Sequence, residues 1–154
     1  MAAIVRRLPV GVQSFVEIRK RGCLYVDKTE MVWNLVNGVK YNYLSRPRRF
    51  GKSVLVDTLQ AYFEGRRDLF EGLKIMELEQ EWVKHPVIRL DMSRGGATGA
   101  TVRSYLDLAF SRYEETYNIT VRPNSSLASR FDSIILAAYK QNGQQVAVLI
   151  DEYD

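Results

Sequence analysis

Apolar residues recur every three or four positions in several stretches of the chain, which is the spacing of one face of a helix. After Ser53, for example, apolar residues fall at positions 55, 59, 62 and 63, and Gly65 stands where a helix commonly ends. Helices are predicted over Ser14–Arg21, from Asp27 as N-cap to about Val36, from Ser53 to Gly65, around Arg66 to Trp82, over Val102–Tyr113 and over Leu127–Ala138.

Three other runs have the pattern of strands. Val87–Asp91 is one, and Val146–Ile150 is a continuous apolar run of mostly β-branched residues, which predicts a strand buried on both faces. A third β-prone run begins at Lys40 and breaks into a basic loop. This alternation predicts an α/β fold with a mostly parallel sheet, in which residues 1–39 form a small, mostly helical cap and residues 40–154 one domain.

Composition fits a folded protein rather than a disordered one. The 154 residues are 46% hydrophobic and 26% charged, and the formal net charge of +4 suits an anionic ligand and allows nucleic acid. The single cysteine, Cys23, excludes an internal disulfide. No apolar stretch approaches the roughly 20 residues of a membrane span, and the N-terminus lacks the apolar core of a signal peptide. We therefore expect a cytoplasmic protein without a membrane segment.

The basic loop ends in Gly51-Lys52-Ser53 and has the chemistry of a phosphate-binding loop, or Walker A motif. Such a loop needs a close backbone approach, a flexible ammonium group and a hydroxyl for Mg²⁺, which these three residues offer in turn. The usual motif has a glycine five residues before the second glycine, and Arg46 stands there instead. Because a Gly-Lys-Ser tripeptide also arises by chance, a second signal is required.

That second signal is the pair Asp151-Glu152 after the last predicted strand. Ligands of parallel α/β sheets bind at the carboxyl ends of the strands, so these carboxylates stand where a Walker B motif would place them. A phosphate loop and a strand that ends in Asp-Glu are the two halves of a Mg-nucleotide site.

Four segments together resemble the AAA-ATPase-like family of bacterial P-loop proteins, and the likeness spans essentially the whole chain. These segments are Leu8-Pro9-Val10-Gly11 with Phe15, Tyr25-Val26-Asp27-Lys28-Thr29, Arg46-Pro47-Arg48-Arg49-Phe50-Gly51-Lys52-Ser53 and Leu149-Ile150-Asp151-Glu152-Tyr153-Asp154. In this family the arginine-rich loop replaces the glycine-rich version, so Arg46 fits the family. The resemblance implies a three-layer P-loop NTPase fold, with ATP and Mg²⁺ as ligands.

The resemblance also implies roles for matching residues. Lys52 would contact the β- and γ-phosphates, Ser53 and Asp151 would hold Mg²⁺, and Glu152 would be the general base that polarises the attacking water. The nucleotide would be bound by Arg48, Arg49, Phe50, Gly51, Lys52, Ser53 and Val54. The implied function is Mg-dependent ATP hydrolysis coupled to a partner or an attached domain.

Several alternatives stay open at this point. Arg46, Arg48 and Arg49 can contact phosphate oxygens, bind nucleic acid or form a solvated loop. Asp27 is a helix cap or helps to close over the nucleotide base. A nucleotide-gated nucleic-acid-binding module with little turnover is the main alternative function, and a phosphotransferase is a third. Composition and motifs leave the oligomeric state undetermined.

The position of Asp151 close to the last residue predicts that the chain is a fragment. In the implied fold, a later strand with a polar sensor residue lies between the phosphate-loop strand and the Asp151 strand. We therefore expect a sheet that stops before its central strand, and weak or absent catalysis. Longer relatives often carry a nuclease-like region beyond the ATPase domain.

Overall fold

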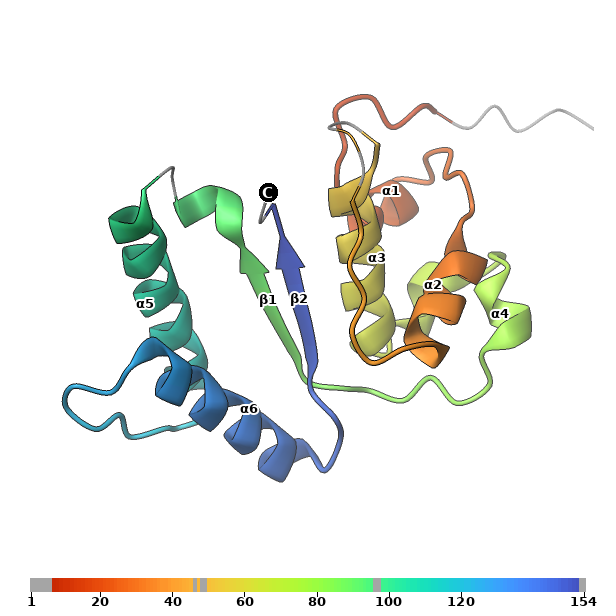
Figure 1. The fold of residues 1–154 in the computed structure, drawn as a ribbon. Helices are drawn as coiled ribbons and strands as arrows, with labels where there is room; N and C mark the ends of the chain where they lie inside the picture. The colour runs from red at the N-terminus through yellow and green to blue at the C-terminus, as the bar shows by residue number, and fades with distance from the viewer. Residues whose placement is uncertain (1–6, 46, 48–49, 96–97, 153–154) are drawn as a thin grey trace, which may run out of the picture. The chain divides into compact units, whose positions relative to one another are not determined.

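The computed structural model describes residues 7–45, 47, 50–95 and 98–152. They form two compact units, one that ends at Val83 and one that begins at Lys84. Each unit has its own hydrophobic core and is described by itself (Figure 1). Of the helices in these ranges, none combines the length and the apolar character that crossing a bilayer requires.

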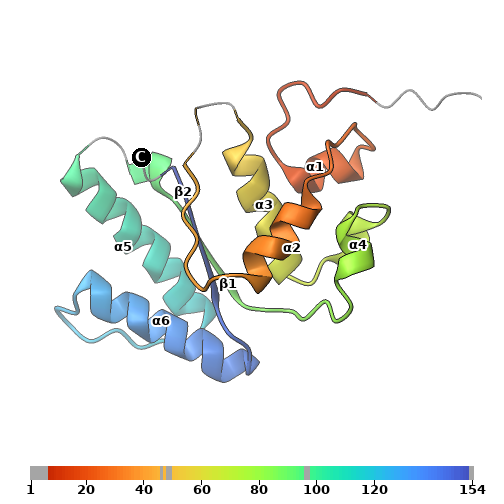
Figure 2. The same cartoon turned by 45° about the vertical axis from the view of Figure 1, so that its right-hand side comes forward.

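The first unit is helical, and aromatic side chains fill its core. Its elements are α1 (Phe15–Lys20), α2 (Thr29–Asn37), α3 (Lys52–Phe63), a 3-10 turn η1 (Arg67–Phe70) and α4 (Ile75–Leu78) (Figure 2). The ring of Phe70 lies 5.0 Å from that of Phe15 and 5.0 Å from that of Trp82, measured between centroids. Phe15, Phe70 and Val32 are fully buried, so burial of apolar surface holds α1 and α2 against η1.

The helix predicted over Ser14–Arg21 is confirmed, with α1 inside it. Ser14 is the N-cap, and its hydroxyl accepts a hydrogen bond from the Glu17 N–H at 3.3 Å. Gly22 follows the helix with a φ of 63°, a left-handed conformation that glycine adopts without a steric penalty.

Asp27 was expected to cap α2, but the N-cap residue is Lys28, which makes no side-chain cap bond. Asp27 does accept a hydrogen bond from the Thr29 N–H at 2.9 Å, and its other carboxylate oxygen accepts one from the Lys74 N–H at 2.7 Å. Asp27 thus bonds the starts of both α2 and α4 from the position before the α2 N-cap.

Two predictions about the first unit are wrong. The run that begins at Lys40 is not a strand: the described residues up to Ser45 are irregular, and Tyr41 and Tyr43 are exposed. Asn42 bonds the Leu35 carbonyl at 3.3 Å and the Val39 carbonyl at 2.9 Å, and such local bonds compete with strand pairing.

The segment predicted as helical around Arg66 to Trp82 holds only two short helical pieces, η1 and α4. Gly72 separates them with a φ of 73°, which is incompatible with a continuous helix.

The second unit consists of two parallel strands joined by a connection that contains two helices. Its elements are β1 (Val87–Asp91), a 3-10 turn η2 (Met92–Gly95), α5 (Gly99–Thr116), α6 (Leu127–Asn142) and β2 (Ala147–Asp151). β1 and β2 run side by side, with Val87 opposite Ala147 and Asp91 opposite Asp151 (Figure 1). Ile88 and Leu90 of β1 pack with Phe110 of α5 and Ile134 of α6. Both strands and both helices were predicted.

The prediction that β2 is buried on both faces is wrong. Val148 is 37% exposed and Ile150 is 45% exposed, although their register partners Ile88 and Leu90 are buried. Register partners in a parallel pair share a face, so α5 and α6 cover that face over β1 and leave it open over β2. The described sheet has two strands and is consistent with an α/β fold. The third layer of the predicted three-layer fold is not seen among the described residues.

Candidate functional site

The phosphate-loop half of the predicted site lies in the first unit, at the start of α3. Gly51 is the N-cap residue and has left-handed angles, φ 75° and ψ 25°. A side chain at this position would be strained even though the space around it is open. The first hydrogen bond of α3 runs from the Leu55 N–H to the Gly51 carbonyl at 3.0 Å. The N–H groups of the first three helical residues therefore point out of the N-terminal end.

No side-chain oxygen caps this end of α3 among the described residues, which distinguishes it from α1, α5 and α6. Its N–H groups and the positive end of its dipole suit an anion such as a phosphate. Lys52 and Ser53 are the first two residues of the helix, and both are partly exposed. This local geometry fits the phosphate groups of a nucleotide.

Polar contacts further along α3 hold the helix within its unit. Asp57 accepts hydrogen bonds from the Ser14 hydroxyl at 2.9 Å and from the Val16 N–H at 3.3 Å, so its carboxylate ties α3 to the start of α1. The buried Thr58 hydroxyl donates to the Val54 carbonyl at 2.7 Å. Burial raises the pKa of Tyr25, while a hydrogen bond with Thr58 opposes that rise. Asp57 thus holds the middle of α3, and the Tyr62 hydroxyl, which donates to Glu79, holds its C-terminal end.

The basic loop before α3 is described only in part. Arg46, Arg48 and Arg49 lie outside the described residues, so their three alternative roles stay predictions. Phe50 is 63% exposed and Val54 is half-buried against the core of the first unit. Phe50 is therefore available at the surface beside Gly51.

The acidic half of the predicted site lies in the second unit, at the end of β2. Asp151 is the last strand residue and is only 6% exposed, and one of its oxygens lies 3.9 Å from an Arg89 guanidinium nitrogen. The Glu152 N–H donates to the other oxygen of Asp151 at 3.0 Å. Glu152 is exposed and has a φ of 53°, which is uncommon for a residue other than glycine. The chain therefore turns sharply between the two acids, and their side chains can take different roles.

A third carboxylate, which was not among the predicted site residues, lies at this end of the strands. Asp91 is the last residue of β1 and lies opposite Asp151 in register. Burial raises the pKa of the Asp91 carboxyl. Hydrogen bonds from Ser93 and Arg94 lower it by more than burial raises it, so the net shift of the pKa is downward. The signal was available in the sequence, because both predicted strands of this unit end in aspartate.

The predicted metal ligands are divided between the units, Ser53 in the first and Asp151 in the second. Each is described within its own unit. Among the described residues, no group of three or more histidine, cysteine, aspartate or glutamate side chains is arranged to hold a metal ion by itself.

The Tyr25 to Thr29 segment is one of the four segments that resemble the family. Its hydrogen bonds join two helices of the first unit. The fully buried Thr29 hydroxyl donates to Asp27 at 2.7 Å and accepts from the Ile75 N–H at 3.1 Å. With the bond from Lys74 to Asp27, this joins the start of α2 to the start of α4. These contacts give Asp27 a structural role at the start of α2, and its alternative role of closing over a nucleotide base stays a prediction.

Comparison with known proteins agrees with these local features. A family model described as "Predicted AAA-ATPase" matches residues 9–154. A protein of Azotobacter chroococcum mcd 1, "Uncharacterized protein in vnfD 5'region", is 35% identical over 156 residues, covering 97% of this chain and 29% of that protein. The chain thus spans less than a third of the length of this curated relative. No solved structure gives a significant match. The match along almost the whole chain shows that it belongs to the AAA-ATPase-like family, whose description implies a nucleotide as ligand.

Proposed function

We propose that this chain is the ATP-binding part of a P-loop ATPase that hydrolyses ATP with Mg²⁺ and passes the resulting change to a partner or an attached domain. The observation that carries the proposal is the start of α3. Gly51 holds left-handed angles, leaves the helix end without a side-chain cap, and is followed directly by Lys52 and Ser53. Because the chain belongs to the AAA-ATPase-like family, we interpret this helix start as the site for the phosphates of ATP.

On the phosphate side, the first N–H groups of α3 receive the phosphate oxygens, and the Lys52 ammonium group neutralises the β- and γ-phosphates. The Ser53 hydroxyl is the ligand that α3 contributes to the metal. Arg48, Arg49, Phe50 and Val54 flank these groups and complete the nucleotide-binding segment. Mg²⁺, when bound, supplies charge neutralisation between the β- and γ-phosphates.

On the acidic side, Asp151 holds the metal through its water shell, and Glu152 orients and polarises the attacking water. The division is reasonable because Asp151 is buried and faces Arg89, whereas Glu152 is exposed after a sharp turn of the backbone. A general base must stay off the metal to accept a proton, and the exposed residue meets that need.

Thermal unfolding with and without Mg-ATP tests the binding half of the proposal. A ligand that binds only the folded state stabilises it, by about 3 kcal/mol at a concentration of 100 times its Kd. We expect a rise in the melting temperature of the parent chain that disappears in Lys52→Ala. Lys20→Ala is the matched control, because Lys20 is an exposed lysine in the last turn of α1 of the same unit.

A folded parent chain without any shift at millimolar Mg-ATP would contradict the proposal, and so would a shift that Lys52→Ala retains. Glu152→Gln tests hydrolysis separately, by phosphate release. We expect this variant to keep the Mg-ATP shift and to lose whatever turnover the parent has, because the amide accepts no proton. Equal turnover in the two chains would remove Glu152 from the catalytic role.

A further inference from the structure

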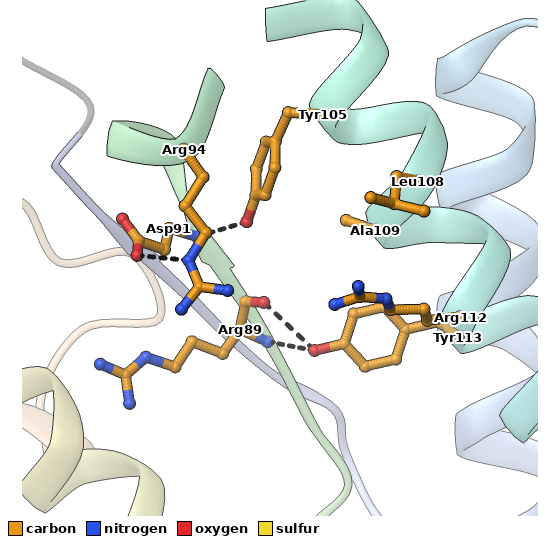
Figure 3. A pocket seen from close by; sticks show the side chains of 8 residues that line it. All are labelled: Arg89, Asp91, Arg94, Tyr105, Leu108, Ala109, Arg112 and Tyr113. Carbon is orange, nitrogen blue, oxygen red and sulfur yellow. Dashed lines mark hydrogen bonds and ion pairs between the residues drawn. The ribbon is translucent and has the colours of Figure 1, made fainter. Parts of the chain in front are cut away.

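A cavity of about 370 Å³ opens between β1 and α5, and every described residue that lines it belongs to the second unit. Figure 3 shows its parts: Leu108 and Ala109 of α5 form an apolar side, and the rings of Tyr105 and Tyr113 flank the opening. Of the described residues, neither those at the start of α3 nor Asp151 and Glu152 line this cavity. Its volume is at the lower end of the range of about 300–1,000 Å³ found for ligand pockets.

The two tyrosine hydroxyls differ in what they leave for a ligand. The Tyr113 hydroxyl accepts a hydrogen bond from the Arg89 N–H at 2.8 Å and donates one to the Arg89 carbonyl at 3.2 Å, so its proton is used. The Tyr105 hydroxyl accepts from the Asp91 N–H at 2.8 Å. Its proton has no acceptor within the part of the chain that the structure describes, so Tyr105 keeps a donor for a ligand.

Two guanidinium groups extend toward the same space, from Arg94 of η2 and Arg112 of α5 (Figure 3). Asp91 fixes the first, with an oxygen 3.1 Å from Arg94 Nε, which leaves the two terminal nitrogens of Arg94 unused by any described residue. Arg112 is exposed, and its side chain makes no ion pair or hydrogen bond with the described residues. The side chain of Arg89 runs away from this space in the same view.

The cavity therefore presents hydrogen-bond donors and few acceptors. The Asp91 carboxylate is occupied by the Ser93 N–H at 3.2 Å and the Ser93 hydroxyl at 2.6 Å, in addition to Arg94. Arg94 and Arg112 against Asp91 leave one excess positive charge beside the opening. A donor set of two planar guanidinium groups and a phenolic O–H matches an oxyanion, which can accept several bonds in one plane.

We propose that this cavity binds a small molecule that carries a phosphate or carboxylate group, with the oxyanion on Arg94, Arg112 and Tyr105 and the apolar part against Leu108 and Ala109. The ligand is small because the cavity is small, and it is anionic because the unused groups of the lining are donors. This site goes beyond the proposed ATP site, and its test is independent of ATP.

The test is an amide NMR titration of the whole chain with phenyl phosphate, benzoate and inorganic phosphate at constant ionic strength. We expect saturable shifts of the amides in η2 and in α5 from Tyr105 to Tyr113, with phenyl phosphate or benzoate binding more tightly than inorganic phosphate. Tighter binding of phenyl phosphate assigns a phosphate ester, and tighter binding of benzoate assigns a carboxylate.

Arg112→Gln should weaken that binding about tenfold, because it removes a charge-assisted pair from a residue that has no structural contact to lose. Arg103→Gln is the matched control, since Arg103 is an exposed arginine of the same helix outside the lining. Tyr105→Phe should also weaken binding, and its amide spectrum shows whether β1 is intact. Lys52→Ala should change nothing, which separates this cavity from the phosphate loop.

Three outcomes overturn the proposal. The first is the absence of saturable shifts with all three probes. The second is an equal loss in Arg103→Gln and Arg112→Gln, which would show general charge attraction. The third is loss of the shifts in Lys52→Ala, which would place the probe on the phosphate loop.

Discussion

The long helices α3 and α5 each lie against the core of their own unit, but they begin in opposite ways. α5 begins with a capping box, in which the Thr98 hydroxyl accepts from the Thr101 N–H at 3.3 Å and the Thr101 side chain accepts from the Thr98 N–H. α3 begins at Gly51 without a side-chain cap. The start of α5 is capped by its own side chains, whereas no described side chain caps the start of α3.

The two helices also differ in how polar groups hold them. α5 is tied to α6 by Arg130, whose guanidinium group bonds Glu114 at 2.7 and 2.8 Å and Asp107 at 2.7 Å. α3 is tied to α1 by the single carboxylate of Asp57. The described polar contacts of α3 thus link it to α1 through Asp57 and to Glu79 through the Tyr62 hydroxyl, whereas those between α5 and α6 converge on Arg130.

Of the variants that test this comparison, Arg130→Ala should lower the free energy of unfolding most. Arg130→Ala leaves the Glu114 carboxylate, whose side chain is only 8% exposed, without its partner, and breaking a buried pair costs about 3–5 kcal/mol. Both tryptophans, Trp33 and Trp82, belong to the first unit, so their fluorescence does not report this change. Urea unfolding should be followed by the amide signals of α5 and α6.

Two further variants make the Arg130 result specific. Arg103→Ala removes an exposed arginine of α5 and should change stability by less than about 0.5 kcal/mol. Replacing Arg130 and Glu114 together by methionine should restore much of the loss, because no charge is left buried. A loss below 1 kcal/mol in Arg130→Ala would show that the pair contributes little to the packing of α5 on α6.

Asp57→Ala should have a smaller effect, about 1–2 kcal/mol, because two hydrogen bonds to the start of α1 are lost. Tryptophan fluorescence during urea unfolding reports this change, since Trp33 packs against the core of the first unit. A double-mutant cycle with Ser14→Ala isolates the contact between the two side chains. Strictly additive losses would mean that Asp57 does not hold α1 through Ser14.

Substitutions at the helix starts should change stability no more than Asp57→Ala does. Thr98→Ala removes a capping bond and should cost about 1 kcal/mol. Gly51→Ala places a side chain at a φ of 75° and should cost about 1–2 kcal/mol. The two variants should differ in thermal unfolding with Mg-ATP, where only Gly51→Ala loses the ligand-induced rise. An equal loss of that rise in Thr98→Ala would contradict the difference between the two starts.

The elements that the sequence predicts well are those with strong local signals. β1 has the predicted bounds Val87–Asp91, and α6 ends before Gly143, whose φ is 68°. The helix predicted from Ser53 is α3, which begins one residue earlier. In each case the apolar period and a glycine or a capping residue are enough to define the element.

Contacts between distant segments account for what the sequence did not reveal. Asp27 bonds Lys74, which is 47 residues away, and Arg130 bonds Glu114 across two helices. The run after Lys40 has strand-forming residues but is not a strand, since local β-propensity decides little without a pairing partner. The joint use of Ser53 and Asp151 for a metal stays a prediction, as does the division into residues 1–39 and 40–154.

The tyrosines of α5 have a consequence for how the protein behaves in concentrated solution. Tyr113 occupies both backbone groups of Arg89, and Tyr105 occupies the Asp91 N–H, on the edge of β1 that does not face β2. A strand edge with open N–H and C=O groups is a template for a foreign strand and hence for aggregation. Because two phenol groups stand where that strand would bind, we expect β1 to resist such intermolecular pairing.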